Sequence, residues 1–354
     1  EEIRDEIEKA YVVGGGVECF ISASIGVSVF PTDGTGAEVL IRHADTAMYA
    51  SNAAGRNAVT CVESQMDDHT QQRITLVNSL REAIRGGELL LEFQPQLDVA
   101  TEEIVGAETL VRWRHPTRGV VAPNEFIGVA EDTGMMVPLG EWVLKNACAA
   151  AAGWSQLSNI RVAVNISGRQ LEQRDFPGRV RAILEESSLP PGRLELELTE
   201  TLAARDSTLR TLAGLRELGV RVAIDDFGTG YSSFTLLKRL PADLLKIDQS
   251  FVHDAMTQDS GAVILDAILR MARGLGLEVV AEGVETVEEM DLLLSLGCHL
   301  MQGYLLGKPV PKSDLEPLMT DPDALWRLPI QRPEAWNPPS REELNRSPVE
   351  RDEP

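Results

Sequence analysis

The sequence predicts an α/β fold: a (β/α)8 TIM-like barrel with an antiparallel first strand, preceded by a small α+β unit. Eight short apolar segments follow one another between residues 89 and 303, and from the second onward each gap holds a plausible helix. Alternating strands and helices imply right-handed crossovers and a parallel sheet. Eight strands in about 220 residues match the size of such a barrel.

The predicted strands are apolar and short, and several of them end in polar residues. In chain order they are Leu89–Pro95, Ile104–Arg112, Arg161–Ile166, Leu194–Thr199, Val220–Asp225, Leu244–Ile247, Glu278–Ala281 and Leu300–Gly303. Only Asp98–Glu103 separates the first two, so they should pair as an antiparallel hairpin. Helices are expected in the later gaps, for example over Ser207–Leu218 and Ala262–Leu275. An open doubly wound sheet is the alternative, but no glycine-rich phosphate-binding turn follows the first strand.

The flanking segments differ from the barrel in composition. Residues 1–62 predict a small unit with a strand over Phe20–Phe30 and an amphipathic helix over Ala37–Ala53 that ends at Gly55. The polar, helical pattern of residues 63–82 suits a linker helix, and the barrel domain is expected over residues 83–320. Many Pro, Arg and Glu residues with little apolar periodicity predict a disordered tail over residues 321–354.

Composition limits the class of partner and the compartment. The net charge of −22 argues against a nucleic-acid polymer or an anionic membrane surface as the partner of this segment. The four cysteines are far apart, which favours reduced thiols in a cytoplasmic protein. No apolar run approaches the length of a membrane span. The chain starts at Glu1 rather than Met, so a membrane anchor upstream stays open.

Polar residues gather where the predicted strands end. Glu108 lies within the second strand, and seven further residues lie at or near strand ends: Asn165, Glu197, Asp225, Asp226, Lys246, Glu282 and Gln302. In this class of barrel the active site is built at the carboxyl ends of the strands, from residues on several of them. Such residues are costly in a buried strand unless they are paired or bind a ligand. The pattern therefore predicts an active site at this end of the barrel.

The chemistry of these residues favours hard cations. Oxygen donors come from Glu108, Asn165, Glu197, Asp225, Asp226 and Glu282, and no His or Cys joins them. All-oxygen ligand sets suit Mg²⁺, Mn²⁺ or Ca²⁺. Five carboxylates exceed the needs of one ion, so two ions about 3.5–4 Å apart are expected, which is the arrangement that assists in-line displacement at phosphorus. Lys246 could orient water, take part in proton transfer or stabilise phosphoryl oxygens, and the sequence does not choose among these roles.

At this point the motifs resemble a known family. They include Glu108-Thr109-Leu110-Val111-Arg112-Trp113, Val164-Asn165-Ile166-Ser167, Glu197-Leu198-Thr199-Glu200, Asp225–Ser233, Leu245-Lys246-Ile247-Asp248, Ala281–Glu285 and Gln302–Pro309. Together they resemble EAL-domain cyclic di-GMP phosphodiesterases from about Leu89 to Pro309. The resemblance implies a barrel with an antiparallel first strand, two Mg²⁺ or Mn²⁺ ions, inhibition by Ca²⁺, a homodimer formed through the EAL domain, and hydrolysis of cyclic di-GMP to linear pGpG.

Carried over position by position, the resemblance implies a role for each residue. The family's metal ligands match Glu108, Asn165, Glu197, Asp225, Asp226 and Glu282. Its catalytic positions match Lys246, Glu282, Asp226 and Gln302. Its substrate contacts match Gln94, Leu110, Arg112, Asp248 and Glu285. Glu200 matches a residue that secures the loop after Asp226. Thr109 departs from the family pattern, where Ala is usual, but it lies on the opposite strand face from Glu108, so little effect is expected.

Residues 1–62 resemble the C-terminal half of a GGDEF diguanylate cyclase domain. The resemblance rests on Ser24-Ile25-Gly26-Val27, Ala44–Tyr49 and Gly55-Arg56-Asn57. The loop that names the family is absent, and Asn52 stands where a phosphate-contacting Lys is usual. No cyclase activity is therefore expected from this chain.

Two other functions fit part of the pattern. A catalytically silent receptor for cyclic di-GMP would use the same pocket, but such domains typically lack metal or base residues that are present here. A lyase of the enolase type would need a base other than Lys246 and leaves Arg112 and Gln94 without a role. For single residues, a structural ion pair for Lys246 and a hydrogen-bonding role for Gln302 are the simpler alternatives.

Overall fold

The computed structural model describes residues 2–7, 11–13, 17–19, 23–53, 59–61, 66–154, 160–203, 205–228, 240–258 and 260–320. Contacts divide the chain into two compact units, residues 1–82 and 83–354, and each is described by itself. The predicted tail over residues 321–354 lies outside the described residues, as does Gly55.

The first unit contains short strands and two longer helices. Its elements are α1 (Glu2–Ile7), β1 (Tyr11–Val13), β2 (Val17–Cys19), β3 (Ile25–Val27), α2 (Ala37–Ala53), β4 (Val59–Cys61) and α3 (Met66–Gly86), which continues into the second unit. Strands β3 and β4 are parallel. Helix α2 spans the predicted residues and passes so close to β3 that a side chain at Gly26 would collide with the backbone of Ala44. Glycine is required there because only it permits this approach.

The strand predicted over Phe20–Phe30 is wrong in length. Only Ile25–Val27 of the described part forms a strand, and residues 20–22 lie outside the description. Beyond it the backbone is used for a turn, since Asp33 N donates to Val29 O at 2.7 Å and Val29 N donates to Asp33 Oδ2 at 2.6 Å. A backbone group that is paired within a turn is not available to a strand ladder.

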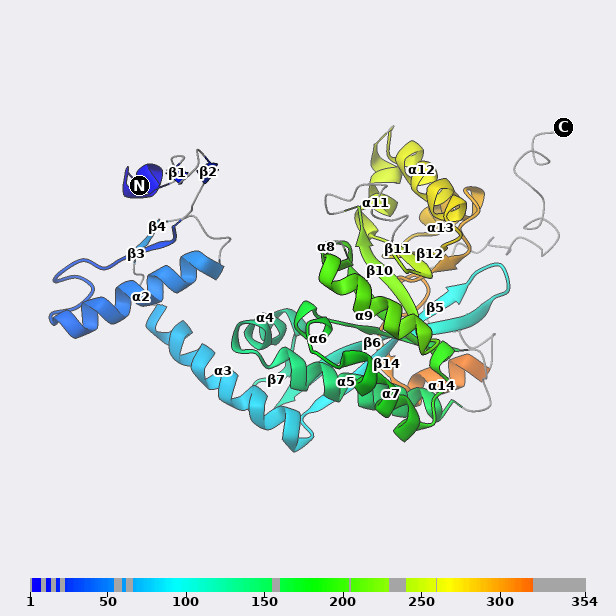
Figure 1. Cartoon of the computed structure of the whole chain (residues 1–354), viewed down its shortest axis with the longest axis horizontal. Coiled ribbons are helices and arrows are strands. Elements are labelled where there is room, and N and C mark those ends of the chain that lie inside the picture. Colours follow the sequence, from blue (N-terminus) through cyan, green and yellow to red (C-terminus); the bar gives the residue numbers. More distant parts are fainter. Residues whose placement is uncertain are drawn as a thin grey trace. The chain divides into compact units, whose positions relative to one another are not determined.

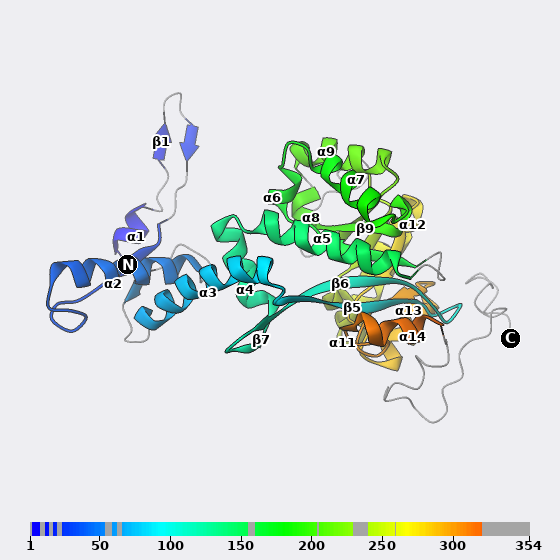
Figure 2. The same cartoon turned by 90° about the horizontal axis from the view of Figure 1, so that it is seen from below.

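The second unit is a closed eight-stranded barrel. Its strands are β5 (Leu89–Asp98), β6 (Glu103–His115), β8 (Arg161–Asn165), β9 (Leu194–Thr199), β10 (Arg221–Phe227), β11 (Leu244–Ile247), β12 (Glu278–Ala281) and β13 (Leu300–Met301). Neighbours from β6 through β13 pair in parallel, while β5 is antiparallel to both β6 and β13 and closes the ring. Figure 2 shows the two long strands β5 and β6 side by side. This closure confirms the predicted barrel and rules out the open sheet.

Helices surround the barrel, as Figure 1 shows for α8, α9, α11, α12 and α13. The remaining elements of this unit are β7 (Gly119–Val121), α4 (Pro123–Thr133), α5 (Met136–Ala152), α6 (Gly168–Leu171), α7 (Phe176–Ser187), the 3₁₀ turn η1 (Pro191–Arg193), α8 (Glu200–Ala203), α9 (Asp206–Glu217), α11 (Gln249–Thr257), α12 (Gly261–Gly274), α13 (Val287–Ser295), β14 (Val310–Pro311) and α14 (Lys312–Thr320). None of the described helices combines the length and apolar character needed to cross a membrane.

In the barrel, the predicted bounds of strands and helices agree with the structure to within a few residues, and the difference at the last strand bears on the site. The last strand ends at Met301 instead of Gly303. Gln302 still donates its N–H to Ala281 O at 2.8 Å, but its carbonyl then accepts from Val284 N at 3.1 Å. Gly303 passes so close to the backbone of Val284 that no side chain would fit there. The chain therefore leaves the sheet at the place where a predicted site residue stands.

The barrel has two distinct ends. The mouth is the end where the parallel strands finish, and the base is the end where they begin. Between them lies an apolar layer of Ala223, Leu244 and Val280 with Leu300 packed against it. Because side chains two and four residues apart on a strand share a face, this layer has polar residues above it and below it on the same strands.

Candidate functional site

The strand register brings the predicted polar residues together at the mouth. Glu108 on β6 lies opposite Ala163 on β8, and Asn165 at the end of β8 lies opposite Glu197 on β9. Asp225 on β10 lies opposite Thr199, the last residue of β9. Inward-facing residues of neighbouring parallel strands form layers in such a barrel. The layer at the mouth is therefore strongly acidic.

Lys246 on β11 lies among four carboxylates. Its side chain is only 1% exposed, and its Nζ atom is 2.7 Å from Glu282 Oε1, 3.0 Å from Glu197 Oε2, 3.1 Å from Asp225 Oδ1 and 3.4 Å from Glu108 Oε2. A buried ammonium is costly unless it is paired. One cation facing four acids leaves an excess of negative charge, so the mouth can accept further positive charge.

The pKa values of this group follow from burial and mutual charge. Burial lowers the pKa of Lys246, but the four carboxylates outweigh it and raise this pKa well above its usual value. Burial raises the pKa of Glu282 to about 7, with Lys246 acting against it and Asp225 adding to it. For Glu108, burial is outweighed by Lys246 and by hydrogen bonds from Gln302 and Asn165, so its pKa is lowered. The mouth thus holds a protonated lysine among acids of unequal strength.

The carboxylate of Glu197 is buried and poorly paired. Its side chain is fully buried, and neither carboxylate oxygen has a hydrogen-bond donor among the described residues. Lys246 lies 3.0 Å from one oxygen, but not in hydrogen-bonding geometry. Burial and the neighbouring acids raise the pKa of Glu197 well above its usual value. Buried carboxylate oxygens that accept no hydrogen bond are suited to coordinate a cation.

Asp225, Asp226 and Glu282 converge as well. One carboxylate oxygen of each lies within 4.8 Å of the others, a spacing that suits a shared metal ion. Asp226 has a positive φ of 52°, and its N–H donates to Asp225 Oδ1 at 3.1 Å. This backbone conformation turns two adjacent carboxylates toward the same region, which an extended strand would send to opposite faces. Burial, Asp225 and Asp248 raise the pKa of Asp226.

A chain of amides holds Glu108 in place. Asn165 Nδ2 donates to Glu108 Oε1 at 2.8 Å, and Gln302 Nε2 donates to Glu108 Oε2 at 2.6 Å. The amide of Gln302 also donates to Gln94 Oε1 at 3.1 Å, and Gln94 Nε2 donates to Gly307 O at 3.1 Å. Gln94 and Gln302 thus belong to one buried network with Glu108.

The predicted substrate contacts on β6 lie above this network. Leu110 and Arg112 share a strand face with Glu108 and lie successively nearer the mouth. Arg112 Nε is 2.8 Å from Glu92 Oε2, on the neighbouring strand β5. The guanidinium is half-buried and aligned by Glu92, so it can present donors to an anionic ligand.

Asp248 and Glu285 lie on the loops that follow β11 and β12. Asp248 caps α11, accepting from Ser250 N at 3.0 Å, and it contributes to the raised pKa of Asp226. Glu285 is exposed, and its N–H donates to Glu289 Oε2 at 2.8 Å. In the described part of the chain, neither residue forms a hydrogen bond or an ion pair with Lys246 or Glu108, so these two lie at the margin of the acidic group.

Glu200 contacts the backbone immediately after the aspartate pair. Its side chain is 4% exposed, and its Oε2 atom accepts from Gly228 N at 2.9 Å. A side chain at Gly228 would collide with the Phe251 ring. Residues 229–239, which carry the rest of the glycine-hinged loop, lie outside the described residues.

Three residues of this region escaped the sequence analysis. Gln96 Nε2 donates to Gln302 Oε1 at 3.1 Å, Glu92 aligns Arg112, and Glu195 is fully buried below Glu197. Each stands two residues from a predicted site residue, on the same strand face. The period-two pattern of polar residues in β5 and β9 was the signal that could have identified them.

Thr109 lies on the other face of β6, as expected. It is 3% exposed and stands opposite Phe93 and Val164. Its hydroxyl oxygen has no hydrogen-bond partner among the described residues. The departure from the family pattern therefore affects packing outside the barrel and leaves the acidic mouth unchanged.

Comparisons with known proteins agree with this geometry. The family model described as EAL domain matches residues 77–309, and the model described as diguanylate cyclase, GGDEF domain matches residues 3–58. A Pseudomonas aeruginosa protein named bifunctional diguanylate cyclase/cyclic di-GMP phosphodiesterase MucR is 41% identical over 302 residues, covering 84% of this chain and 44% of the relative. An uncharacterized signaling protein of Caulobacter vibrioides is 42% identical over 324 residues, covering 90% of this chain and 40% of the relative.

The structure is also similar to solved structures. The one described as "PaMucR Phosphodiesterase, c-di-GMP complex" has a TM-score of 0.66 and 42% identity, covering 68% of this chain and 99% of that chain. This chain spans less than half the length of the two curated relatives named above. The EAL model matches well over half of the chain, and the barrel carries that family's motifs at its mouth. The chain belongs to the EAL domain family.

Proposed function

We propose that this chain hydrolyses cyclic di-GMP to linear pGpG. The observation that carries the proposal is the mouth of the barrel, where Lys246 lies within 3.4 Å of four carboxylates and both oxygens of Glu197 are buried without donors. The similarity to proteins named as cyclic di-GMP phosphodiesterases supports the substrate. A relative solved as a complex with c-di-GMP supports binding at an EAL barrel.

Two divalent cations, Mg²⁺ or Mn²⁺, fit the residues present. The proposed ligands are Glu108, Asn165, Glu197, Asp225, Asp226 and Glu282, all of which offer oxygen atoms. Two features support this fit: the oxygens of Glu197 have no hydrogen-bond donor among the described residues, and the carboxylates outnumber the single ammonium of Lys246. When bound, such ions would polarise a phosphoryl oxygen and lower the pKa of a water.

The chain's own residues then have separable tasks. We assign Lys246 to orienting the attacking water and stabilising phosphoryl oxygens, because its ammonium lies at the centre of the acidic group, whose carboxylates raise its pKa. Glu282 lies 2.7 Å from Lys246 Nζ and converges with Asp225 and Asp226, so we assign it to the metal site and to holding the water that Lys246 orients. Gln302 and Asn165 hold Glu108 by hydrogen bonds. Asp226 completes the acidic group beside Asp225.

Substrate would be held above the metal ligands. We assign this task to Gln94, Leu110, Arg112, Asp248 and Glu285. The planar fork of Arg112 suits phosphate oxygens or a guanine edge. The exposed position of Glu285 and the loop position of Asp248 suit contacts with the ends of an extended ligand.

A silent receptor is the competing function. It would bind cyclic di-GMP without cleaving it, and it predicts that some ligand or base position is lost. Every proposed position carries the expected residue here, and the acids face one cation, which favours the enzyme. The lyase alternative would need a base other than Lys246 and assigns no role to Arg112 or Gln94.

The remaining assignments extend the same proposal. We propose a division into residues 1–62, 63–82, 83–320 and 321–354, and the family matches over residues 3–58 and 77–309 support its first and third parts. We propose a homodimer through the EAL domain, for which exposed Val263 and Ile264 on α12 and Met256 on α11 offer apolar surface. A cytoplasmic location suits a domain that acts on a nucleotide messenger.

The deciding experiment is incubation of the purified chain with cyclic di-GMP and Mg²⁺ or Mn²⁺, with chromatography of the products. Linear pGpG should form, EDTA should abolish its formation, and either ion should restore it. Ca²⁺ should inhibit, because its larger and looser shell would misplace the water. Tight binding without product in the presence of either ion would establish the receptor function, and undiminished turnover after thorough chelation would exclude the metal-dependent mechanism.

A further inference from the structure

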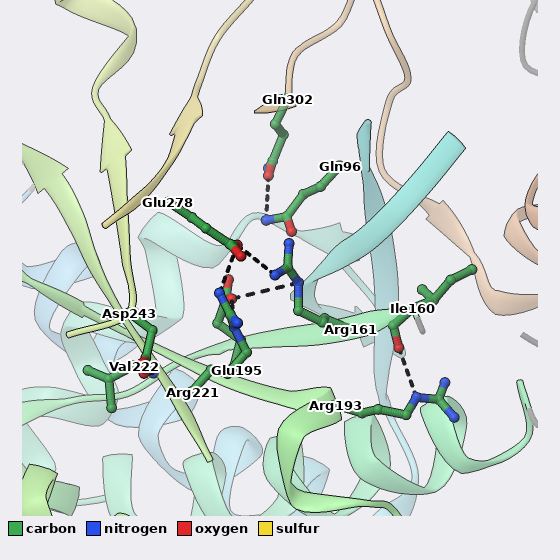
Figure 3. A network of polar contacts seen from close by, with 10 residues as sticks. All are labelled: Gln96, Ile160, Arg161, Arg193, Glu195, Arg221, Val222, Asp243, Glu278 and Gln302. Carbon is green, nitrogen blue, oxygen red and sulfur yellow. Dashed lines mark hydrogen bonds and ion pairs between the residues drawn. The ribbon is translucent and has the colours of Figure 1, made fainter. Parts of the chain in front are cut away.

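The base of the barrel holds a second cluster of charged residues, far from the mouth along the strands. Arg161 Nη1 and Arg221 Nη2 each lie 2.7 Å from Glu278 Oε2. Both guanidinium groups also face Glu195 Oε2, Arg221 at 3.4 Å and Arg161 at 4.0 Å. Figure 3 shows these four side chains converging from β8, β9, β10 and β12.

A cavity opens beside this cluster. Its volume is about 720 Å³, and its walls include Arg161, Arg193, Arg221 and Arg273 together with Asp98 and Glu278. This size is typical of small-ligand sites. A second cavity of about 420 Å³ adjoins it and shares Arg221 and Glu278. The base is therefore hollowed around its arginines.

The lining of the larger cavity is cationic, in contrast to the chain as a whole. Four arginines face two acidic side chains, in a protein whose net charge is −22. Arg193 donates to Ile160 O at 2.9 Å and to Ala151 O at 3.0 Å, and Arg273 donates to Leu296 O. No carboxylate of the described residues lies within ion-pair distance of either guanidinium. Two arginines thus retain uncompensated charge.

Buried polar atoms beside the cavity also remain unsatisfied. Arg161 Nε has no hydrogen-bond partner among the described residues, and neither does Glu195 Oε1. Glu195 itself is fully buried. Such atoms are rare in folded proteins. The Nε–H of Arg161 is a donor that an anion can satisfy, whereas Glu195 Oε1 is an acceptor and needs a donor such as an ordered water.

Charged residues at the base of a barrel commonly contribute to stability, and the ion pairs made by Arg161 and Arg221 fit that role. Arg193 and Arg273 donate to Ala151 O and Leu296 O, at the C-terminal ends of α5 and α13, which is a helix-capping contact. This contact uses only part of the N–H groups of each guanidinium and gives neither of them an acidic partner. Guanidinium groups are the donors that suit phosphate oxygens best.

We propose that this cavity binds a small phosphate-bearing anion, with Arg193 and Arg273 as its principal donors. Arg161 and Arg221, fixed by Glu278 and Glu195, would form the floor of the site. The ligand class is defined by its phosphate group, which a free phosphate, a pyrophosphate or a nucleotide can supply. The site is separate from the catalytic mouth and is used by no step proposed above.

The separation of the two sites follows from the strands. Each of three strands carries one residue at the base and a second one four residues, or about 13 Å, further toward the mouth. These pairs are Arg161 and Asn165 on β8, Arg221 and Asp225 on β10, and Glu278 on β12 with Glu282 directly after that strand. The apolar layer of Ala223, Leu244 and Val280 lies between them. A variant at the base can therefore be tested without removing a residue of the mouth.

The test is isothermal titration calorimetry of the full chain with pyrophosphate. The buffer contains no metal ions, so that the negative charge of the mouth repels this anionic probe. Inorganic phosphate and GMP, titrated separately, distinguish a simple anion from a nucleotide. Arg273→Ala removes an exposed donor of the cavity, and Arg193→Met removes the second. Arg270→Ala is the matched control, because Arg270 lies on the same helix and pairs with Asp266 in solvent. Arg112→Ala controls for binding at the mouth.

The wild-type chain should bind pyrophosphate, and Arg273→Ala and Arg193→Met should each weaken binding about tenfold or more, as loss of a charge-assisted hydrogen bond implies. Arg270→Ala and Arg112→Ala should bind like wild type, and Arg273→Lys should recover part of the affinity. Absence of binding for all three probes would overturn the proposal. So would unchanged affinity in both cavity variants, or loss of binding in Arg112→Ala.

Discussion

At the scale of single residues, the mouth contains one buried lysine that faces more carboxylates than its single positive charge can neutralise. Lys246 is buried and lies within ion-pair distance of four carboxylates, while the oxygens of Glu197 accept no hydrogen bond from the part of the chain that the structure describes. This imbalance distinguishes the mouth from a structural ion-pair cluster, in which charges and hydrogen bonds are matched. Three substitutions test what individual side chains contribute.

Glu108→Ala should abolish turnover and weaken metal binding while the barrel stays folded. Glu108 lies at the mouth, so its removal opens no cavity in the apolar core. Product chromatography, titration with Mn²⁺ and circular dichroism measure the three effects. Glu103→Ala, at the exposed start of the same strand, is the control and should behave like wild type. Near-normal turnover in Glu108→Ala would show that Glu108 is not a ligand.

Lys246→Ala should separate chemistry from binding. Turnover should fall about 10²–10⁴-fold with little change in affinity for cyclic di-GMP, because the ammonium acts mainly in the transition state. Calorimetry with Ca²⁺ as a non-productive ion reports affinity, and metal content is measured in the same variant. A collapse of affinity with normal turnover at saturating substrate would make Lys246 a binding residue.

The same variant should lose stability when no metal is present. Removing one partner of a buried ion-pair group leaves the others uncompensated, at a cost of about 3–5 kcal/mol. Added Mn²⁺ should restore part of the loss, since it replaces the missing positive charge. Thermal melts with EDTA and with Mn²⁺ measure both effects, and a variant as stable as wild type in EDTA would contradict the electrostatic account.

Thr109→Val should stabilise the chain by about 1 kcal/mol. The change keeps the shape of the side chain and removes a buried hydroxyl that has no described partner. Thr133→Val is the contrasting control, because the Thr133 hydroxyl donates to Val129 O at 2.6 Å. Denaturant unfolding compares the two. Destabilisation of Thr109→Val by as much as the control would mean that its hydroxyl is satisfied.

At the scale of elements, alternation along strands determined what could be predicted. Acids and amides repeat every second residue in β9, at Glu195 and Glu197, and in β5, at Glu92, Gln94 and Gln96. The strand face on which these side chains lie therefore follows from the sequence alone. The positive φ of Asp226 did not follow, because nothing local distinguishes it from the preceding strand residues. Nor did the contact of Gln96 with Gln302, which joins residues 206 positions apart and depends on closure of the barrel.

The contact between α8 and the end of β10 provides a test at this scale. Glu200→Ala removes the acceptor for Gly228 N, so the backbone after Asp226 should open more often. We expect faster amide exchange at Gly228 and a several-fold lower affinity for Mn²⁺. Glu185→Ala, on the surface of α7, is the control. If exchange and affinity both stay at wild-type values, the contact does not organise the aspartate pair.

At the scale of the whole molecule, the barrel and most of its acidic mouth could be predicted, whereas the base could not. The mouth consists of residue types with an obvious shared chemistry, and strand order places them together. The base combines Arg161, Arg193, Arg221 and Arg273 from four elements, and arginines in a sequence are most often solvated surface residues. Only the closed ring reveals that they line one cavity.

The first unit gives a prediction for the chain as a whole. Incubation with GTP and Mg²⁺ should yield no cyclic di-GMP, because the loop that names the GGDEF family is absent from residues 1–62. Assays should use the Glu108→Ala variant, so that hydrolysis by the barrel cannot hide a product. Any cyclic di-GMP formed from GTP would refute this prediction.

The reversed direction of β5 determines where the chain enters the barrel. In a barrel with eight parallel strands the first strand begins at the base, but here Leu89 pairs with Trp113, beyond Glu108 toward the mouth. Glu88, just before this strand, accepts from the indole of Trp113 at 3.0 Å, and its carbonyl accepts from Arg114 N at 2.9 Å. These contacts are made one and two residues beyond Arg112. Because the chain enters the barrel at the mouth, a backbone change at Glu88 reaches the segment that carries Arg112 without crossing the barrel.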